Sequence, residues 1–370
     1  MKVPFLDLHA AYEELRPELD AAALRVLNSG WYILGEEVSA FEREYAEFCE
    51  AAECVGVGNG LDALQLALRA VGVGAGDEVI VPSHTYIAPW LAVSLVGAKP
   101  VPVEPKVDTY NLDPAATRAK VKAVDADAIL AVHLYGLPAA MDALSEIAAE
   151  ENVALIEDAA QAHGARYAGE PVGTFGDAAA FSFYPTKNMT TGEGGMVLTD
   201  HEAVADQAAS FINHGRTGDD SYAHTRVGHN FRLTSLAAAI GRVQLDRLPE
   251  WVARRRENAR RLTDGLAAVD GIETPHEPAN RTHAYHQYTI RTPERDRLRE
   301  QLTDRGVDTG VYYPTAIHQL AAYEGFDVSA PAAEAAAEEV VSLPVHPTLS
   351  DADLDRIVEA TRRAVTHLRA

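Results

Sequence analysis

Short apolar runs alternate, through the first two thirds of the chain, with longer segments in which apolar residues recur every three or four positions. The runs predict strands and the longer segments predict amphipathic helices. The expected strands cover residues 54–58, 78–82, 99–104, 128–136, 153–158, 178–183 and 195–200. The expected helices between them include 61–72, 86–97 and 139–150. This order predicts an α/β fold, with a mostly parallel sheet covered by helices on both faces.

The pattern changes after a long helix predicted over residues 233–262. The segments that follow it predict a smaller α+β unit, and they cover 286–291, 295–306, 308–314, 330–341, 340–345 and 351–368. We therefore expect two domains, one of residues 1–255 with an N-terminal arm, and one of residues 256–370.

The formal net charge of −23 limits which partners the protein can bind. Binding to a phosphate backbone requires a basic surface, so a nucleic-acid partner is disfavoured. The acidic residues are spread along the chain and lysine is scarce, which predicts a solvated acidic surface in a salty cytoplasm that screens the self-repulsion.

Targeting and metal signals are not recognisable in the sequence. We see no charged-then-apolar leader and no apolar run long enough for a bilayer, so we expect a cytoplasmic protein without a membrane partner. The two cysteines, Cys49 and Cys54, lack zinc spacing and are too few for a disulfide framework. We predict no metal site.

Lys187 stands out because the chain has only six lysines and carries most of its basic charge as arginine. It follows the strand predicted at 178–183, in the stretch FSFYPTKN. An amine can form an imine with a carbonyl, which a guanidinium cannot do. A solvated loop lysine is the commoner role for such a residue taken alone.

Three other strand ends carry candidate chemistry, because ligands bind at the carboxyl ends of parallel strands. The stretch GVGNGLDALQLAL begins a helix near Leu61, where free N–H groups suit a phosphate. Its glycines do not complete a dinucleotide fingerprint, and a plain turn capped by Asn59 or Gly60 is an equal alternative. The stretch PSHTYIAP places Tyr86 after a strand, where its ring could stack on a flat ligand or pack in the core.

The third strand end is IEDAAQAHGA, which delivers Asp158 to the edge of the sheet. A buried carboxylate needs a partner, and a protonated pyridine nitrogen is suitable, although a helix N-cap is a common role for such a residue. His163 alone would be structural. Pyridoxal 5′-phosphate (PLP) requires a phosphate site, an aromatic ring, a buried Asp and a lysine, and the helix start near Leu61, Tyr86, Asp158 and Lys187 supply them in this chain order. Ser182 is a possible further donor to the phosphate.

These motifs resemble the DegT/StrS family of nucleotide-sugar aminotransferases, a branch of the fold type I PLP superfamily. Similar segments run along nearly the whole chain, and EDAAQAHGA and FSFYPTKN are the most specific of them. The resemblance implies the PLP aminotransferase fold, with a large α/β/α domain and a smaller C-terminal α+β domain.

The resemblance also implies roles for particular residues. Lys187 would bind the cofactor covalently, Asp158 would pair with its ring nitrogen, Gln161 would lie beside its hydroxyl and Tyr86 would stack on its ring. The implied phosphate contacts are Gly60, the backbone of Leu61, Ser182 and Asn230. The implied sugar and diphosphate contacts are Tyr184, Tyr313, His318 and Arg226. Asn230 and Arg226 would reach over from a second subunit, which implies a homodimer with shared active sites.

The implied reaction is transfer of the glutamate amino group to a nucleotide-linked keto sugar. Several segments look most like the members that aminate a dTDP-linked 3-keto-6-deoxyhexose. A 4-keto-sugar or keto-inositol aminotransferase is an alternative, and a PLP-dependent sugar dehydratase or a regulatory PLP-binding protein is a more distant one. Relatives often have His-Tyr-Pro where this chain has Tyr312-Tyr313-Pro314, so the sugar contacts there stay open.

Overall fold

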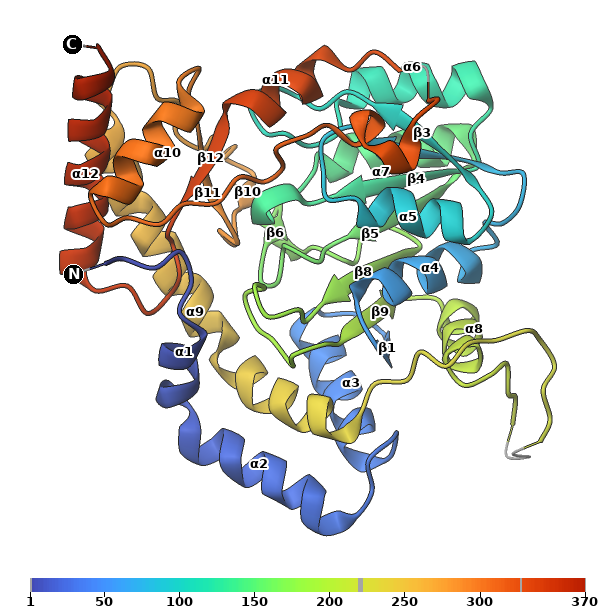
Figure 1. Cartoon of the computed structure of the whole chain (residues 1–370). Helices are drawn as coiled ribbons and strands as arrows, with labels where there is room; N and C mark the ends of the chain where they lie inside the picture. The colour runs from blue at the N-terminus through green and yellow to red at the C-terminus, as the bar shows by residue number, and fades with distance from the viewer. Residues whose placement is uncertain (1, 219–221, 327, 370) are drawn as a thin grey trace.

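The computed structural model describes residues 2–218, 222–326 and 328–369 of the chain. Its centre is a seven-stranded sheet with helices on both faces, continued at one side by a smaller group of elements (Figure 1). The strand order is β1-β9-β8-β5-β4-β2-β3. The strands are β1 (Glu53–Val57), β2 (Glu78–Pro82), β3 (Lys99–Val103), β4 (Ala128–Val132), β5 (Ala154–Asp158), β8 (Ala178–Ser182) and β9 (Gly195–Thr199). Every strand predicted for this part of the chain is therefore present, and the predicted α/β class is confirmed.

The sheet is parallel from β3 through β8 and antiparallel at one side. The pairs β2–β3, β2–β4, β4–β5 and β5–β8 are parallel, whereas β9 runs antiparallel to both β8 and β1. The carboxyl ends of β4, β5 and β8 therefore meet at one edge. Asp158 lies there, at the last position of β5, opposite Ala180 of β8.

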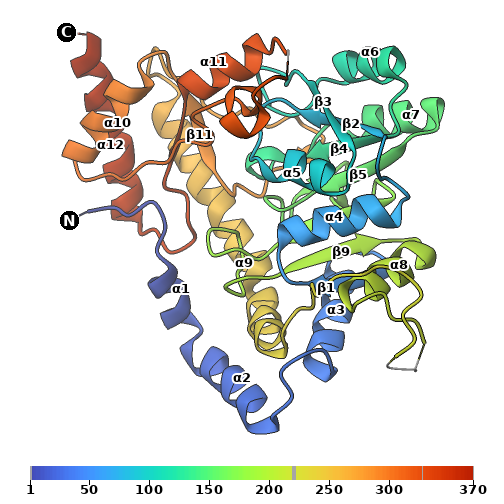
Figure 2. The same ribbon diagram turned by 45° about the vertical axis from the view of Figure 1, so that its right-hand side comes forward.

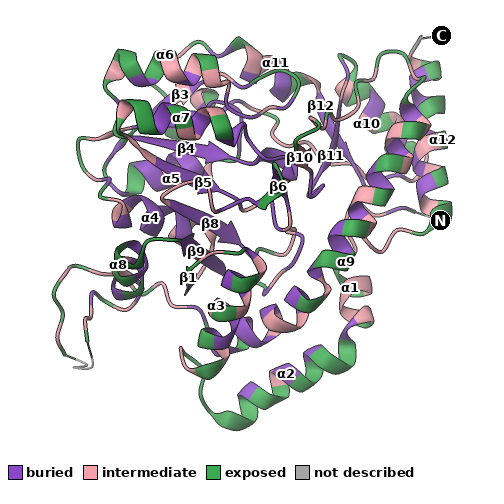
Figure 3. Ribbon diagram, turned by 180° about the vertical axis from the view of Figure 1, so that it is seen from behind, coloured by how far each residue is buried: buried purple, intermediate pink, exposed green. Residues whose placement is uncertain are grey.

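Successive strand residues face opposite helical layers, which is why the strands read as continuous apolar runs. One layer contains α4 (Gly60–Ala70), α5 (Ala88–Leu95) and α8 (Glu202–Ile212), and it packs on one face of the sheet. The other face packs against α3 (Glu36–Phe48), α6 (Pro114–Val124), α7 (Met141–Glu151) and the first half of α9 (Ser235–Leu266). Seen from behind, the strands are almost wholly buried and the outer helix faces are exposed (Figure 3).

The smaller group of elements collects beyond the middle of α9. It contains β11 (Tyr288–Arg291) paired antiparallel with β12 (Val340–Leu343), together with α10 (Arg295–Asp304), α11 (Pro331–Glu339) and α12 (Asp351–Arg369). The segment 308–314 is not a strand and contributes one bridge, from Gly310 to Ser342. The short strands β6 (Arg166–Tyr167), β7 (Glu170–Pro171) and β10 (Arg281–Thr282) form a separate three-stranded sheet. Three short 3-10 turns complete the elements: η1 (Leu134–Gly136), η2 (Ile317–Gln319) and η3 (Ala321–Tyr323).

The N-terminal arm lies against the smaller group rather than beside the sheet. Val3 forms a parallel bridge with Val307 and is buried in the same hydrophobic cluster as residues 259–365. The arm then continues into α1 (Leu8–Glu14) and α2 (Arg16–Ser29), which follow α9 along one side of the molecule (Figure 2). The predicted domain boundary at 255/256 falls inside the continuous helix α9 and stays a prediction.

None of the helices in residues 2–218, 222–326 and 328–369 combines the length and apolar character that crossing a bilayer would take.

Candidate active site

Asp158 ends β5 with its carboxylate buried at the edge of the sheet. The side chain is 6 % exposed, and one of its oxygens accepts a hydrogen bond from the backbone N–H of Ala160 at 3.0 Å. A turn follows it rather than a helix, so the N-cap alternative does not apply. Burial raises the pKa of Asp158, while the Ala160 N–H and the Lys187 ammonium oppose that rise. The carboxylate is thus positioned to hold a cationic partner.

Lys187 lies on the loop that leaves β8, and its backbone N–H donates to the carbonyl of Tyr184 at 2.9 Å. Burial lowers the pKa of its ammonium to about 8, and the Asp158 carboxylate acts in the opposite direction. The effect of burial on this pKa therefore exceeds the effect of the Asp158 charge, and in a fraction of the molecules Lys187 is a neutral amine near neutral pH. A partly neutral lysine can act as a nucleophile or a base.

The N-terminus of α4 approaches the end of β8 so closely that only glycine fits between them. A Cβ atom added to Gly60 would lie 2.6 Å from the Cβ of Ser182. Asn59 caps the helix, because its side-chain oxygen accepts from the N–H of Asp62 at 2.9 Å. The free N–H groups at this end of the helix and the Ser182 hydroxyl therefore share one place, which suits an anion. Leu61 is the second residue of the helix, as predicted.

His163 forms a hydrogen bond with the last residue of β8. Its Nε2 donates to the carbonyl of Ser182 at 2.8 Å, so its Nδ1 must accept from the hydroxyl of Tyr45 at 2.7 Å. Burial lowers the pKa of His163 to about 3, and it is neutral at physiological pH. The structural role expected for this histidine fits these contacts.

Gln161 joins the sheet to the smaller domain. Its Oε1 accepts from the backbone N–H of Tyr135 at 2.7 Å, and its Nε2 donates to the hydroxyl of Tyr313 at 3.1 Å. The ring of Tyr313 lies 5.5 Å, centroid to centroid, from that of Tyr86, and the Asp158 carboxylate raises the pKa of Tyr313 further than burial alone. The structure therefore brings Tyr86, Asp158, Gln161 and Tyr313 together, from positions up to 227 residues apart in the sequence.

Two residues that sequence reasoning missed support this group. The hydroxyl of Tyr135 donates to the carbonyl of Tyr312, so it accepts from Nε2 of His84 at 3.1 Å. The buried hydroxyl of Thr85, next to Tyr86, has no hydrogen-bond partner among the described residues. The only sequence signal for Tyr135 was its place before Gly136 at a strand end.

Of the remaining candidates, Tyr184 contacts Lys187 through its backbone, and His318, Arg226 and Asn230 form no interaction with Lys187 within the described residues. Tyr184 is about half exposed and begins the lysine loop. His318 is buried and pairs with Glu334 at 3.0 Å. Arg226 and Asn230 belong to the segment between α8 and α9, which projects from the body of the molecule (Figures 1 and 2). No interaction between the described residues of one chain joins these two to Lys187, and their placement beside a second subunit stays a prediction.

The donor set fits PLP. Gly60 and Ser182 form an anion site that suits its phosphate, and the exposed Tyr86 ring suits its aromatic ring. The Thr85 hydroxyl, which has no partner among the described residues, suits its polar substituents, and the buried Asp158 carboxylate lies near the Lys187 amine that suits its aldehyde. Within the described parts of the chain, no group of three or more His, Cys, Asp or Glu side chains could hold a metal ion.

Comparison with known proteins agrees with this geometry. Residues 13–362 match the sequence model of the DegT/DnrJ/EryC1/StrS aminotransferase family. The chain is 48% identical over 365 residues to the dTDP-3-amino-3,4,6-trideoxy-alpha-D-glucose transaminase of Streptomyces venezuelae, covering 98% of this chain and 96% of that protein. It is 50% identical over 368 residues to the erythromycin biosynthesis sensory transduction protein EryC1 of Saccharopolyspora erythraea, covering 98% and 100%. The crystal structure of S. venezuelae DesV in complex with a ketimine intermediate superposes with a TM-score of 0.95 at 48% identity, covering 98% of both chains.

Proposed function

The chain belongs to the DegT/DnrJ/EryC1/StrS aminotransferase family, is a PLP-dependent transaminase by that membership, and we propose that it moves the amino group of glutamate onto a nucleotide-linked keto sugar. The preferred acceptor is a dTDP-linked 3-keto-6-deoxyhexose. The name of the Streptomyces venezuelae relative, a 3-amino-sugar transaminase that matches 98% of the chain, supports this choice.

The observation that carries the proposal is the proximity of Lys187, on the loop after β8, to Asp158 at the end of the neighbouring strand β5, close enough for the charge of each to shift the pKa of the other. PLP supplies an aldehyde and an electron-accepting ring when bound. The amine of Lys187, with a pKa of about 8, is neutral often enough to bond to a carbonyl carbon. The buried Asp158 carboxylate would hold a proton on the ring nitrogen, and that contact would keep Asp158 ionised despite its raised pKa.

The same lysine would carry the proton in both half reactions. Its Nζ would take the proton from the α-carbon of glutamate and pass it to the PLP carbon that carried the aldehyde; water would then release 2-oxoglutarate, and the amino group would stay with the cofactor. In the second half it would run this transfer in reverse toward the sugar carbon. Ser182 and the first turn of α4 would anchor the phosphate throughout, while Gln161 would orient the ring hydroxyl.

The sugar would enter beside Tyr313. This residue holds the smaller domain to Gln161 and lies against Tyr86, so its hydroxyl is at the boundary between cofactor and acceptor. Tyr184, with about half its surface exposed at the start of the lysine loop, would face the hexose. His318 would need to be released from Glu334 to contact the sugar.

The working unit in this proposal is a homodimer. Asn230 and Arg226 lie on the projecting segment, where they could reach a second subunit's phosphate and diphosphate sites. Exposed apolar residues on this segment and on the α2–α3 connection, Trp31, Tyr32 and Val227, would be covered by that subunit.

We propose a cytoplasmic location in a salt-rich cell, on the basis of the net charge of −23. Self-repulsion of such a surface is screened by salt. The unfolding temperature is expected to rise between low and molar KCl, and an unchanged temperature would contradict the halophilic part of the proposal.

One experiment separates the proposed function from its alternatives. Glutamate added to the yellow holoenzyme should shift its absorbance, and a dTDP-3-keto-6-deoxyhexose should restore it with release of an amino sugar identified by NMR. If only a 4-keto sugar or a keto-inositol restored the absorbance, that compound would be the acceptor in place of the 3-keto sugar. A dehydrated product would indicate a dehydratase, and no response to any keto sugar would indicate a regulatory protein.

A further inference from the structure

Arg255 is a buried cation without an anionic partner. It lies on α9, is 3 % exposed, and its Nη1 donates to the backbone carbonyls of Tyr285 at 3.1 Å and His286 at 3.5 Å. Its Nε donates to nothing, and no carboxylate in residues 2–218, 222–326 or 328–369 forms an ion pair with it. Burying a charge is costly unless it is paired, so the missing partner calls for an explanation.

No carboxylate among the described residues offsets the charge of Arg255 itself, although Asp7 and Asp353 raise the pKa of the neighbouring His346. Burial and the Arg255 guanidinium lower the pKa of His346 to about 4, and burial, Lys187 and Arg255 lower the pKa of His286 well below its ordinary value. Burial lowers the pKa of Arg255 itself to about 10. The guanidinium of Arg255 therefore has no compensating charge within the described residues, which favours an anion beside it.

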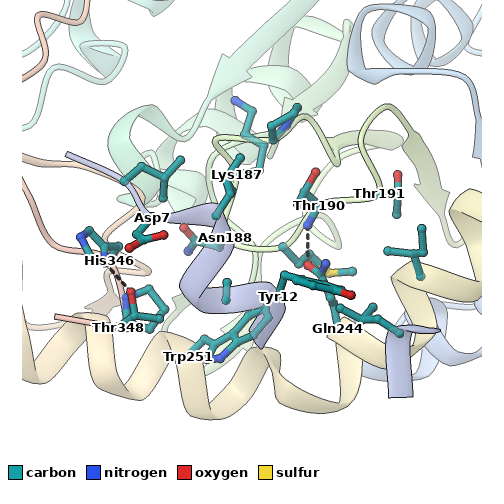
Figure 4. Close-up of a pocket in the computed structure, with 18 of the residues that line it drawn as sticks. Asp7, Tyr12, Lys187, Asn188, Thr190, Thr191, Gln244, Trp251, His346 and Thr348 are labelled. Carbon is teal, nitrogen blue, oxygen red and sulfur yellow. Dashed lines mark hydrogen bonds between the residues drawn. The ribbon is translucent and has the colours of Figure 1, made fainter. Parts of the chain in front are cut away.

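Arg255 lines a cavity of about 420 Å³ next to the lysine loop. Figure 4 shows Lys187 at one edge of this cavity, with Trp251 and Gln244 of α9 across from it and His346 to one side. Arg255 follows Trp251 by one helical turn, so the two share a face of α9. A cavity of this volume is large enough for a small organic molecule.

The cavity adjoins the candidate active site and shares Lys187 with it. Neither Gly60, Tyr86, Asp158, Gln161 nor Ser182 lines it, and Lys187 is the one residue of that set that does. Two carboxylates also line it, Asp7, which accepts from the N–H of Ala10, and Asp20, which accepts from the hydroxyl of Tyr12, both at 2.9 Å, and among the described residues neither forms an ion pair with Arg255.

We propose that this cavity is a binding site for a small carboxylate anion with a short carbon chain. The carboxylate would pair with the Arg255 guanidinium, and the chain would pack on the apolar wall formed by Leu6, Leu19 and Ile240. This site goes beyond the proposed function, because it takes no part in the transfer of the amino group.

The site would couple to the lysine loop. Residues 187–192 form one wall, and the N–H of Thr190 donates to Oε1 of Gln244 at 2.7 Å across the cavity edge (Figure 4). An occupant would therefore restrain the loop that carries Lys187, and the site can serve as a regulatory one.

Butyrate is a suitable probe, because it has one carboxylate and a short chain. Calorimetric titration of the holoenzyme at constant ionic strength measures its affinity without turnover, so the outcome does not depend on which sugar is the acceptor. The test variant is R255Q, and the matched control is R254Q, since Arg254 is the preceding residue and pairs at the surface with Glu14 and Glu250. A second variant, A11F, fills the cavity from α1 and leaves Arg255 intact.

Wild type and R254Q should bind butyrate equally, and R255Q should bind it at least about 10-fold more weakly, the ratio that loss of one charge-assisted hydrogen bond produces. A11F should lose binding as well, and it decides the matter if R255Q fails to fold. Sulfate should bind more weakly than butyrate. Unchanged butyrate binding in R255Q or A11F, equal binding of sulfate, or no binding to wild type would overturn the proposal.

Discussion

Gln161 at the end of the sheet donates a hydrogen bond from Nε2 to the hydroxyl of Tyr313 in the smaller domain, at 3.1 Å. Its other amide atom holds the backbone N–H of Tyr135 at 2.7 Å. One side chain thus fixes the two ends of the site, the strand edge and the segment from the smaller domain, relative to each other. Three of the predictions below concern residues at this edge of the sheet, and the fourth concerns Glu42, which contacts β1.

Removal of the Tyr313 hydroxyl should affect the acceptor more than the donor. We expect Y313F to fold normally and to raise KM for the keto sugar by about 5- to 10-fold, because one hydrogen bond of roughly 1 kcal/mol is lost. The half reaction with glutamate should change little. Stopped-flow absorbance of each half reaction checks this.

The control is Y323F, since the Tyr323 hydroxyl bonds to that of Ser94 at 3.1 Å and, among the described residues, not to Gln161. Equal effects of Y313F on both half reactions would contradict a role in acceptor binding.

Neutralising Asp158 should make Lys187 less basic. The Asp158 carboxylate raises the pKa of Lys187 against the effect of burial, so D158N should lower it below about 8 in the cofactor-free protein. The pH dependence of Lys187 acetylation, followed by peptide mass spectrometry, measures the shift. D246N, a change at an exposed position of α9, should leave it unchanged. A rise in the pKa of Lys187 in D158N would refute the pairing.

The close contact between α4 and β8 should not tolerate a methyl group. G60A places a Cβ 2.6 Å from that of Ser182, so the strand end must shift. We expect a loss of about 1–3 kcal/mol of stability, the usual cost of overpacking, and weaker retention of PLP. Denaturant unfolding and cofactor release on dialysis measure the two effects.

The matched change is G74A, because a Cβ at Gly74 meets nothing within 4 Å. If G60A retained PLP as well as G74A does, the anion cradle would lie elsewhere.

Glu42 should make stability depend on pH around neutrality. Its carboxylate accepts from the N–H of Gly56 at 2.7 Å, and burial raises its pKa to about 7. The folded state therefore binds a proton that the unfolded state has released between about pH 4.5 and 7, and stability falls as pH rises through this window. E42Q keeps the acceptor and removes the charge. Its unfolding temperature should exceed that of wild type at pH 8 and match it at pH 4; a lower temperature at pH 8 would contradict the burial of this carboxylate.

The sequence predicted that Asp158 and Lys187 lie close together, and the structure has them so. This could be predicted because the carboxyl ends of parallel strands meet at one edge of a sheet, so residues that follow two such strands are neighbours whatever separates them in the chain. The role of Tyr135 could not be predicted in this way, because a tyrosine after an apolar strand is usually part of the core, and its backbone angle φ of 60° is uncommon for a residue other than glycine. The pairing of His318 with Glu334 and the course of 308–314 likewise depend on how the smaller domain packs, which no local pattern records.

The antiparallel placement of β9 was also beyond the sequence pattern. A buried antiparallel strand between two neighbours has the same continuous apolar run as a parallel one. Arg226 and Asn230 pose a different problem, because their predicted partners belong to a second subunit and no contact within one chain can test them.

The central claim is that one amine, that of Lys187, forms the covalent bond to PLP. Borohydride reduction of the holoenzyme, followed by proteolysis and mass spectrometry, locates the bond, and K120R provides a control because Lys120 is an exposed lysine on α6. We predict a single reduced adduct on the peptide that contains Lys187, retained in K120R and absent in K187R, whose unfolding remains cooperative. An adduct on any other side chain, or none at all, would contradict the account.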